Sequence, residues 1–265
     1  MAHLLSDDIL HSYTLRGHSH IHNLLSPDDL KKLSEAVESV IANLTSSQSD
    51  MEDAVLSYGK SWIFIENTLR FNSYLKEFFL FGPLQALAQQ LLRCPQAFLL
   101  RDQTYYKYQG GQETPWHQDC LFIPEDDLET VTFWIPFHEI NSNHSPMSYI
   151  DQSHNYCYLG SSFDRLHTFD TFKAIAETDG HSITTYDRMS SGDVLAHSGW
   201  TLHGSPPMPD CSSRKAIVIV YTSTPPRLDA SLTVQSCHRD LRSQAFQIRS
   251  ANQSSYQSLT HFLSS

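Results

Sequence analysis

The stretch from Thr114 to Phe122 places a histidine, His117, and an aspartate, Asp119, two residues apart in a run with the composition of a β-strand. Side chains at positions i and i+2 of a strand leave it on the same face. The imidazole and the carboxylate are therefore expected to point at one spot. They would supply two of the three ligands of a 2-His-1-carboxylate metal site.

A third ligand is offered late in the chain by His203, in the segment Trp200–Pro207. The chain has 15 histidines, so the setting of His203 selects it: Arg214 follows eleven residues later, at the start of another strand-like run. A guanidinium binds a carboxylate through two hydrogen bonds and keeps its charge when buried, which suits the distal carboxylate of 2-oxoglutarate. These residues predict a non-haem Fe(II) centre with a 2-oxoglutarate site beside it.

The order HxD, distal histidine, arginine resembles the Fe(II)/2-oxoglutarate-dependent dioxygenases, and further strings resemble the phytanoyl-CoA dioxygenase (PhyH) family specifically. These strings cover about half of the chain, from Leu99 to Tyr221. They are Asp102-Gln103 through Lys107 ahead of Pro115-Trp116-His117-Gln118-Asp119, Trp134 with Asn143 and Ser153-His154 (the family's W…NG…PGSH), and Gly192-Asp193 leading to Trp200–Ser205.

The chain departs from the family pattern at two places in the loop region after the metal strand. His144 follows the asparagine where glycine is usual, and Asp151-Gln152 stand where Pro-Gly would precede Ser-His. We expect these changes to bear on the substrate and not on iron.

The resemblance implies an enzyme that binds Fe(II) through His117, Asp119 and His203 and uses 2-oxoglutarate and O2 as co-substrates, releasing succinate and CO2. It implies that the co-substrate is held by Arg214, Ser205, Gln103, Lys107 and Trp134. Halogenating relatives have a small residue at the position of Asp119. A carboxylate there implies hydroxylation or a related oxidation, such as desaturation, cyclisation or oxidative dealkylation.

The substrate is expected to be a small organic molecule, in specialised metabolism. The formal net charge of −11 argues against nucleic acid and anionic membranes, and it disfavours an acyl-CoA, whose phosphates call for a basic mouth. A binding cleft is typically apolar with few polar groups. Candidates for the lining are Trp116, Phe122, Met147, Trp200 and His144, with core packing as the alternative for the apolar members.

Two other classes stay open at this point. A metal-dependent cupin enzyme that does not use 2-oxoglutarate would be indifferent to the loss of Arg214. A non-catalytic jelly-roll protein would bind a metal or ligand without consuming O2. A monomer and a homodimer are equally compatible with the sequence.

Strands without intervening crossover helices predict a double-stranded β-helix, the cupin-like jelly roll, with helices ahead of it. We expect one domain over residues 1–265, with a helical N-terminal part over about 1–97, a jelly-roll core over about 98–224 and a surface-wrapping tail over 225–265. Predicted helices cover 26–44, 73–81 and 83–93; predicted strands cover 62–65, 98–107, 131–137, 147–150, 194–196 and 216–222. An insertion or lid is expected within 157–186.

Three smaller features complete the prediction. In the run 98–107, Gln103, Tyr105 and Lys107 share one face, which is expected to line the barrel interior. The histidines of the tract 17–22 alternate, which fits either a short strand or a metal-binding tract. The five cysteines include no CxxC pair and follow no secretory leader, and no apolar run reaches the roughly 18 residues of a membrane span, so a cytoplasmic protein with reduced thiols is expected.

Overall fold

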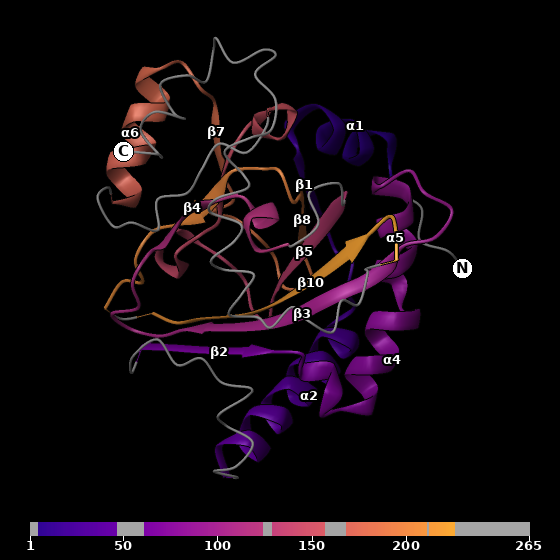
Figure 1. Cartoon of the computed structure of the whole chain (residues 1–265). Helices are drawn as coiled ribbons and strands as arrows, with labels where there is room; N and C mark the ends of the chain where they lie inside the picture. The colour runs from indigo at the N-terminus through magenta and orange to yellow at the C-terminus, as the bar shows by residue number, and fades with distance from the viewer. Residues whose placement is uncertain (1–4, 47–60, 124–128, 157–167, 211, 226–265) are drawn as a thin grey trace.

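Two antiparallel sheets form the centre of the molecule in the computed structural model, which describes residues 5–46, 61–123, 129–156, 168–210 and 212–225 (Figure 1). The six-stranded major sheet has the order β1-β8-β5-β10-β3-β2, and the four-stranded minor sheet has the order β4-β9-β6-β7. The strands are β1 His18–Ile21, β2 Trp62–Glu66, β3 Phe98–Lys107, β4 Thr114–His117, β5 Thr130–Pro136, β6 Ser148–Ile150, β7 Ile183–Thr185, β8 Val194–Ser198, β9 His203–Ser205 and β10 Arg214–Thr222. The expected double-stranded β-helix is confirmed.

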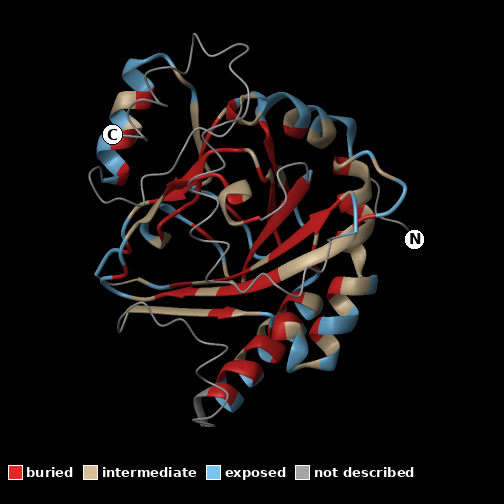
Figure 2. Ribbon diagram, viewed as in Figure 1, coloured by how far each residue is buried: buried red, intermediate tan, exposed pale blue. Residues whose placement is uncertain are grey.

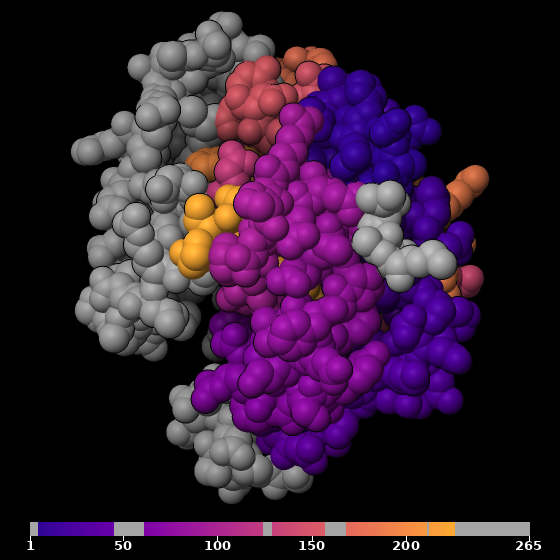
Figure 3. All heavy atoms as spheres, turned by 90° about the vertical axis from the view of Figure 1, so that its right-hand side faces the viewer, coloured from indigo at the N-terminus to yellow at the C-terminus, as the bar shows by residue number. Residues whose placement is uncertain are grey.

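Helices from the first part of the chain cover the outer face of the major sheet (Figure 1). In the space-filling view, atoms of this part of the chain, indigo to purple, make up most of the described surface on that side of the molecule (Figure 3). They are α1 Asp7–Arg16, α2 Pro27–Ser46, α4 Ser73–Phe81 and α5 Pro83–Leu91. The helix α2 begins as its sequence predicts: Ser26 Oγ accepts from the backbone N–H of Asp29 at 3.1 Å, and Pro27 takes the first helical position. Its apolar residues are buried at helical spacing, as Figure 2 shows in red.

The two faces of the major sheet differ in chemistry because side chains alternate along each strand. On β3 and β10, Tyr106, Ile217 and Ile219 point outward into the helix-covered core. Gln103, Tyr105 and Lys107 alternate with these residues and face the barrel interior, as expected from the sequence. The polar groups are thereby gathered between the two sheets.

The N-terminal part contributes more than helices. Strand β1 pairs with β8 at one edge of the major sheet, and β2 pairs with β3 at the other. The helix α1 was not expected from the sequence. Of the expected insertion or lid, residues 157–167 lie outside the described residues. The remainder forms α6 Phe169–Thr178, which packs on the minor sheet, and β7, the strand of that sheet that pairs with β6.

The stretch 114–122 does not form one strand. Strand β4 ends at His117, and Asp119–Phe122 forms a 3₁₀ turn, η3. The backbone N–H of Cys120 donates to the carbonyl of Gly199 at 3.0 Å, and that of Leu121 donates back to Gln118 at 3.1 Å. These tertiary and local hydrogen bonds replace the strand ladder, so the strand predicted for Asp119 is wrong.

Three further 3₁₀ turns are η2 Thr68–Arg70, η4 Ser142–His144 and η5 Ser153–Asn155. Cys94 and Cys120 are not in disulfides. Cys157, Cys211 and Cys237 lie outside the described residues, as does the expected tail from residue 226 on. None of the described helices is long and apolar enough to cross a membrane.

Replacing Leu33 with alanine tests the packing of α2 on the sheet. Leu33 is fully buried in the helix–sheet core, so its truncation leaves a cavity and is expected to lower the free energy of unfolding by about 2–5 kcal/mol. The neighbouring Lys32 is exposed, and Lys32→Ala is expected to change it by less than about 0.5 kcal/mol. Urea denaturation of both variants measures the difference; equal, small effects would contradict the packing described.

Candidate metal centre

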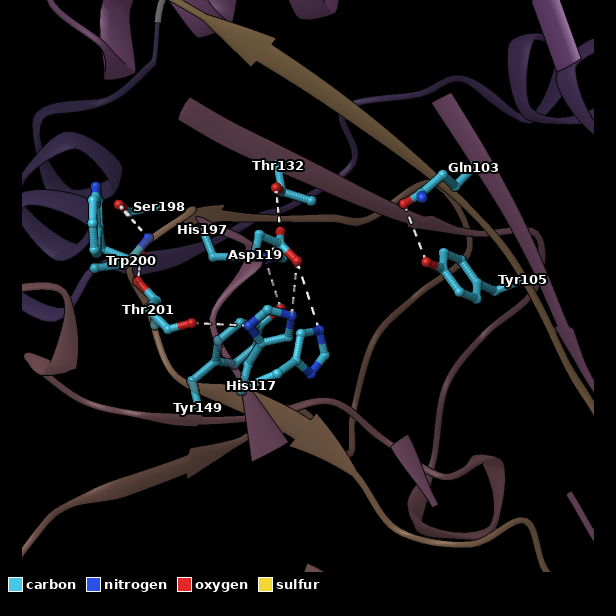
Figure 4. A network of polar contacts seen from close by, with 12 residues as sticks. Gln103, Tyr105, His117, Asp119, Thr132, Tyr149, His197, Ser198, Trp200 and Thr201 are labelled. Atoms are coloured by element: carbon cyan, nitrogen blue, oxygen red, sulfur yellow. Dashed lines mark hydrogen bonds and ion pairs between the residues drawn. The ribbon is translucent and has the colours of Figure 1, made fainter. Parts of the chain in front are cut away.

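His117 on β4 and His203 on β9 are paired across neighbouring strands. Asp119 opens the turn that follows β4. Its Oδ1 lies 3.6 Å from His117 Nε2 and 3.7 Å from His203 Nε2. All three side chains are buried, and one ligand atom of each converges with the others between the two sheets (Figure 4).

Backbone carbonyls fix the orientation of both imidazoles. Nδ1 of His117 lies 2.7 Å from the carbonyl oxygen of Pro115, and Nδ1 of His203 lies 2.9 Å from that of Thr201. A carbonyl only accepts, so each Nδ1 carries the proton and donates it. In the neutral ring this leaves the lone pair on Nε2, the nitrogen that faces Asp119.

The second oxygen of Asp119 is held by the major sheet. Its Oδ2 accepts from Thr132 Oγ1 at 2.6 Å and faces His197 Nε2 at 3.2 Å. On its other side, His197 Nδ1 lies 3.2 Å from the hydroxyl of Tyr149, whose ring stacks on His203 at a centroid distance of 5.7 Å. These contacts leave Oδ1 directed at the two Nε2 atoms.

Sequence reasoning missed Thr132, Tyr149 and His197. A signal was present for two of them, because Thr132 precedes Trp134 by two residues and His197 directly extends the strand predicted over 194–196. His197 and Thr132 are cross-strand partners, which the sequence alone does not reveal.

The electrostatics of the centre favour an ionised carboxylate at Asp119 and a neutral imidazole at His203. Burial alone would raise the pKa of Asp119, but the surrounding imidazoles of His203, His117 and His197 outweigh it and hold that pKa well below its usual range. Burial, with His117 and His197 close by, lowers the pKa of His203 well below its usual value. Two imidazole nitrogens and one carboxylate oxygen on one side of a point form a donor set that fits Fe(II).

Two cations lie buried together where β3 and β10 meet. Arg214 and Lys107 are cross-strand partners, and both are almost fully inaccessible. Arg214 donates to the carbonyl of Ser145, and its guanidinium carbon lies 5.4 Å from the centre of the Trp134 ring. Its Nε has no hydrogen-bond partner among the described residues. Burial lowers the pKa of Arg214 to about 10, so it is charged at neutral pH.

The Lys107 ammonium is surrounded by three acceptors. It donates to Ser145 Oγ at 3.1 Å, Ser205 Oγ at 3.3 Å and the carbonyl of Pro206 at 2.9 Å. Burial and the neighbouring Arg214 lower its pKa well below the usual value. Within the described part of the chain, no carboxylate forms an ion pair with Arg214 or Lys107. A bound dicarboxylate would supply the missing negative charge.

Of the expected co-substrate residues, Arg214, Lys107, Ser205 and Trp134 are brought together here. Gln103 is set apart: it lies four residues from Lys107 on β3, about 13 Å along the strand. It donates to Glu66 Oε1 at 2.6 Å and accepts from the Tyr105 hydroxyl at 3.1 Å (Figure 4).

The five residues expected at the substrate have different surroundings. Phe122 contacts His117 edge to face at 5.8 Å, and Met147 Sδ lies 3.9 Å from Arg214. Trp200 is half-buried on the turn between β8 and β9, where its carbonyl accepts from Gln118 at 2.6 Å.

Trp116 does not fit a substrate wall. It is fully buried, stacks on Phe169 of α6 at 4.9 Å and donates to the carbonyl of that residue. Its side chain leaves β4 on the face opposite to His117, because the two are adjacent in one strand. The core-packing alternative holds for this residue.

The departures from the family pattern have structural roles. His144 Nδ1 accepts from the backbone N–H of Asn141 at 3.2 Å and so caps η4. Asp151 accepts from Thr184 at 2.8 Å and faces His18 Nε2 at 2.9 Å. Gln152 has a φ of 67°, the left-handed conformation for which glycine is best suited. The backbone therefore keeps the left-handed conformation at this position although glutamine replaces the family's glycine.

Three solved structures illustrate the fold. The 2-oxoglutarate-dependent carbocyclase SnoK from nogalamycin biosynthesis has a TM-score of 0.67 at 20% identity, over 86% of this chain and 89% of SnoK. The epimerase SnoN, in complex with Fe³⁺, α-ketoglutarate and nogalamycin RO, has 0.63 at 15%, over 82% of each chain. EctD from S. alaskensis with bound Fe has 0.66 at 17%, over 85% of this chain and 79% of EctD.

Comparison with the curated proteins gives no significant match. The family model described as phytanoyl-CoA dioxygenase (PhyH) matches residues 13–216, which include both sheets up to the start of β10. The chain therefore belongs to the phytanoyl-CoA dioxygenase (PhyH) family of Fe(II)/2-oxoglutarate-dependent dioxygenases.

Proposed function

We propose that the protein oxidises a small organic metabolite, with Fe(II) held by His117, Asp119 and His203. The observation that carries the proposal is the convergence of the Nε2 atoms of both histidines and Oδ1 of Asp119. The other polar atom of each side chain, Nδ1 or Oδ2, is held by a hydrogen bond. Ligands that are preorganised in this way need no rearrangement when a metal binds.

Arg214 is assigned to the distal carboxylate of 2-oxoglutarate, with Ser205 beside it and Lys107 adding charge. The inner face of the minor sheet connects this cation pair to the metal ligands. His203 and Ser205 lie two residues apart on β9, and Tyr149 of the neighbouring strand β6 is the cross-strand partner of His203. Two strand residues span about 7 Å, a distance that an extended five-carbon dicarboxylate can bridge.

Bound Fe(II) would supply the chemistry by which O2 and 2-oxoglutarate yield succinate and CO2 while the substrate is oxidised. The protein's part is positional. Asp119 fills the third ligand position, so the proposed outcome is hydroxylation or a related oxidation. Phe122, at the edge of His117, is the residue best placed to contact the substrate.

A small substrate is favoured by two observations. SnoN is crystallised with nogalamycin RO, and EctD with 2-oxoglutarate and 5-hydroxyectoine, all of them small molecules. The net charge of −11 opposes recognition of the phosphates of an acyl-CoA. We place the reaction in specialised metabolism because SnoK and SnoN, which share the fold, come from nogalamycin biosynthesis.

Anaerobic titration of the metal-free protein tests the cofactor assignment. Adding Fe(II) and then 2-oxoglutarate is expected to produce the weak visible charge-transfer band of the chelate. Admitting O2 should then yield succinate slowly even without substrate. A chelator that removes the iron should abolish succinate formation, and fresh Fe(II) should restore it. Iron binding without the band would favour a cupin that does not use 2-oxoglutarate.

Replacing Arg214 with glutamine is expected to weaken 2-oxoglutarate binding at least about 100-fold. Each hydrogen bond to a charged partner contributes about 1.5–3 kcal/mol, and the variant loses two. Fe(II) affinity should be nearly unchanged. Lys215→Gln is the matched control, because Lys215 follows on the same strand but points outward to Glu38 at 2.6 Å. Calorimetric titration under anaerobic conditions measures both; unchanged 2-oxoglutarate affinity in Arg214→Gln contradicts the assignment.

His197 is expected to act as a positioning residue. Replacing it with phenylalanine removes the contact with Asp119 Oδ2, and loss of such a partner typically costs 10–100-fold in metal affinity. His197→Gln, which offers an amide N–H, should recover part of the loss. Ser198→Ala, on the other face of β8, should bind Fe(II) normally. The dissociation constant for Fe(II) is the readout, and equal values in all four proteins would exclude the role.

A further inference from the structure

The histidine tract of the N-terminus is divided between two environments. His18 and His20 belong to β1, and His22 follows its end. His18 points inward to Tyr186, at 2.8 Å, and to Asp151. His20 and His22 instead face Asp193, the residue that precedes β8, the strand paired with β1. His20, His22 and Asp193 take no part in the proposed oxygenase site.

Three ligand atoms converge at this second place. His20 Nε2 lies 2.9 Å and His22 Nδ1 lies 3.5 Å from Oδ2 of Asp193, and the two imidazole rings are 3.9 Å apart. Ligands about 2.0–2.1 Å from a tetrahedral Zn²⁺ lie roughly 3.3 Å from one another. These two distances bracket that value, and all three ligand atoms lie within 4.8 Å of one another, so side-chain shifts suffice to bring them to one metal ion.

The carboxylate is fixed and the open side faces water. Asp193 accepts from the backbone N–H of Asn23 at 2.9 Å and from that of Ser190 at 2.8 Å. The side chain of Asp193 is 2% exposed, whereas that of His22 is 68% exposed. A metal ion could therefore enter from solvent and keep a water molecule as its fourth ligand.

We propose that His20, His22 and Asp193 form a second metal site, for Zn²⁺ or a similar divalent transition-metal ion, separate from the oxygenase centre. Imidazole and carboxylate ligands suit this class of ion. Metal binding would displace the proton between His20 and Asp193. It would fasten the end of β1, an edge strand, to the turn that leads into β8.

The test counts metal ions on the full chain. Metal-free wild-type protein is dialysed against Zn²⁺, and bound zinc is measured by mass spectrometry. His22→Ala is expected to bind one zinc ion fewer than wild type, and His11→Ala, an exposed histidine on α1, should bind the same number as wild type. In a His117→Ala/His203→Ala background the second site should still take up one ion that His22→Ala then removes.

Co²⁺ provides an independent signature, because a tetrahedral site gives strong visible absorption. That absorption should be lost in His22→Ala and kept in His11→Ala. Equal zinc stoichiometry and equal Co²⁺ spectra in wild type and His22→Ala would overturn the proposal. The Fe(II)/2-oxoglutarate band, recorded on the same variants, reports on the oxygenase centre alone and should be intact in His22→Ala. The failure of one assignment can therefore be distinguished from the failure of the other.

Discussion

The carboxylate of Asp119 lies between the two sheets and is held by both of them. Its Oδ1 faces the histidines of the minor sheet, and its Oδ2 is bound by Thr132 and His197 of the major sheet. A buried charge is tolerated only when it is paired and hydrogen-bonded, so the two sheets must meet in one register around it. The rest of the interior is arranged about this contact.

The cation pair of Lys107 and Arg214 shows that the interior is built for a ligand and not for stability. Two basic side chains buried side by side, with no carboxylate paired to them among the described residues, cost free energy that the apolar core on the other face of the major sheet must offset. One face of β3 and β10 therefore stabilises the fold while the opposite face carries the chemistry. Sites that break local rules in this way are where function is expected.

The sequence predicted much of this, and its failures have physical causes. Alternation in 98–107 separated Gln103, Tyr105 and Lys107 from the outward-facing residues, and the order of the motif identified His203 and Arg214, which the fold places on β9 of the minor sheet and β10 of the major sheet. Alternation failed at Asp119, because a hydrogen bond between distant residues, Cys120 and Gly199, ended the strand early. For His197 the only local signal was its place directly after the predicted strand 194–196, and a histidine there gains its role only through cross-strand pairing with Thr132.

Strand β1 connects the two clusters of histidines. His18 is the cross-strand partner of His197, and it stacks on Tyr149 at 4.6 Å, so it packs behind the residues that orient Asp119 and His203. His20 follows two residues later on the same face, about 7 Å along the strand. An edge strand has a ladder on one side only, which makes its end the part most easily displaced. An interaction that holds the end of β1 at Asp193 therefore also keeps His18 packed against His197 and Tyr149.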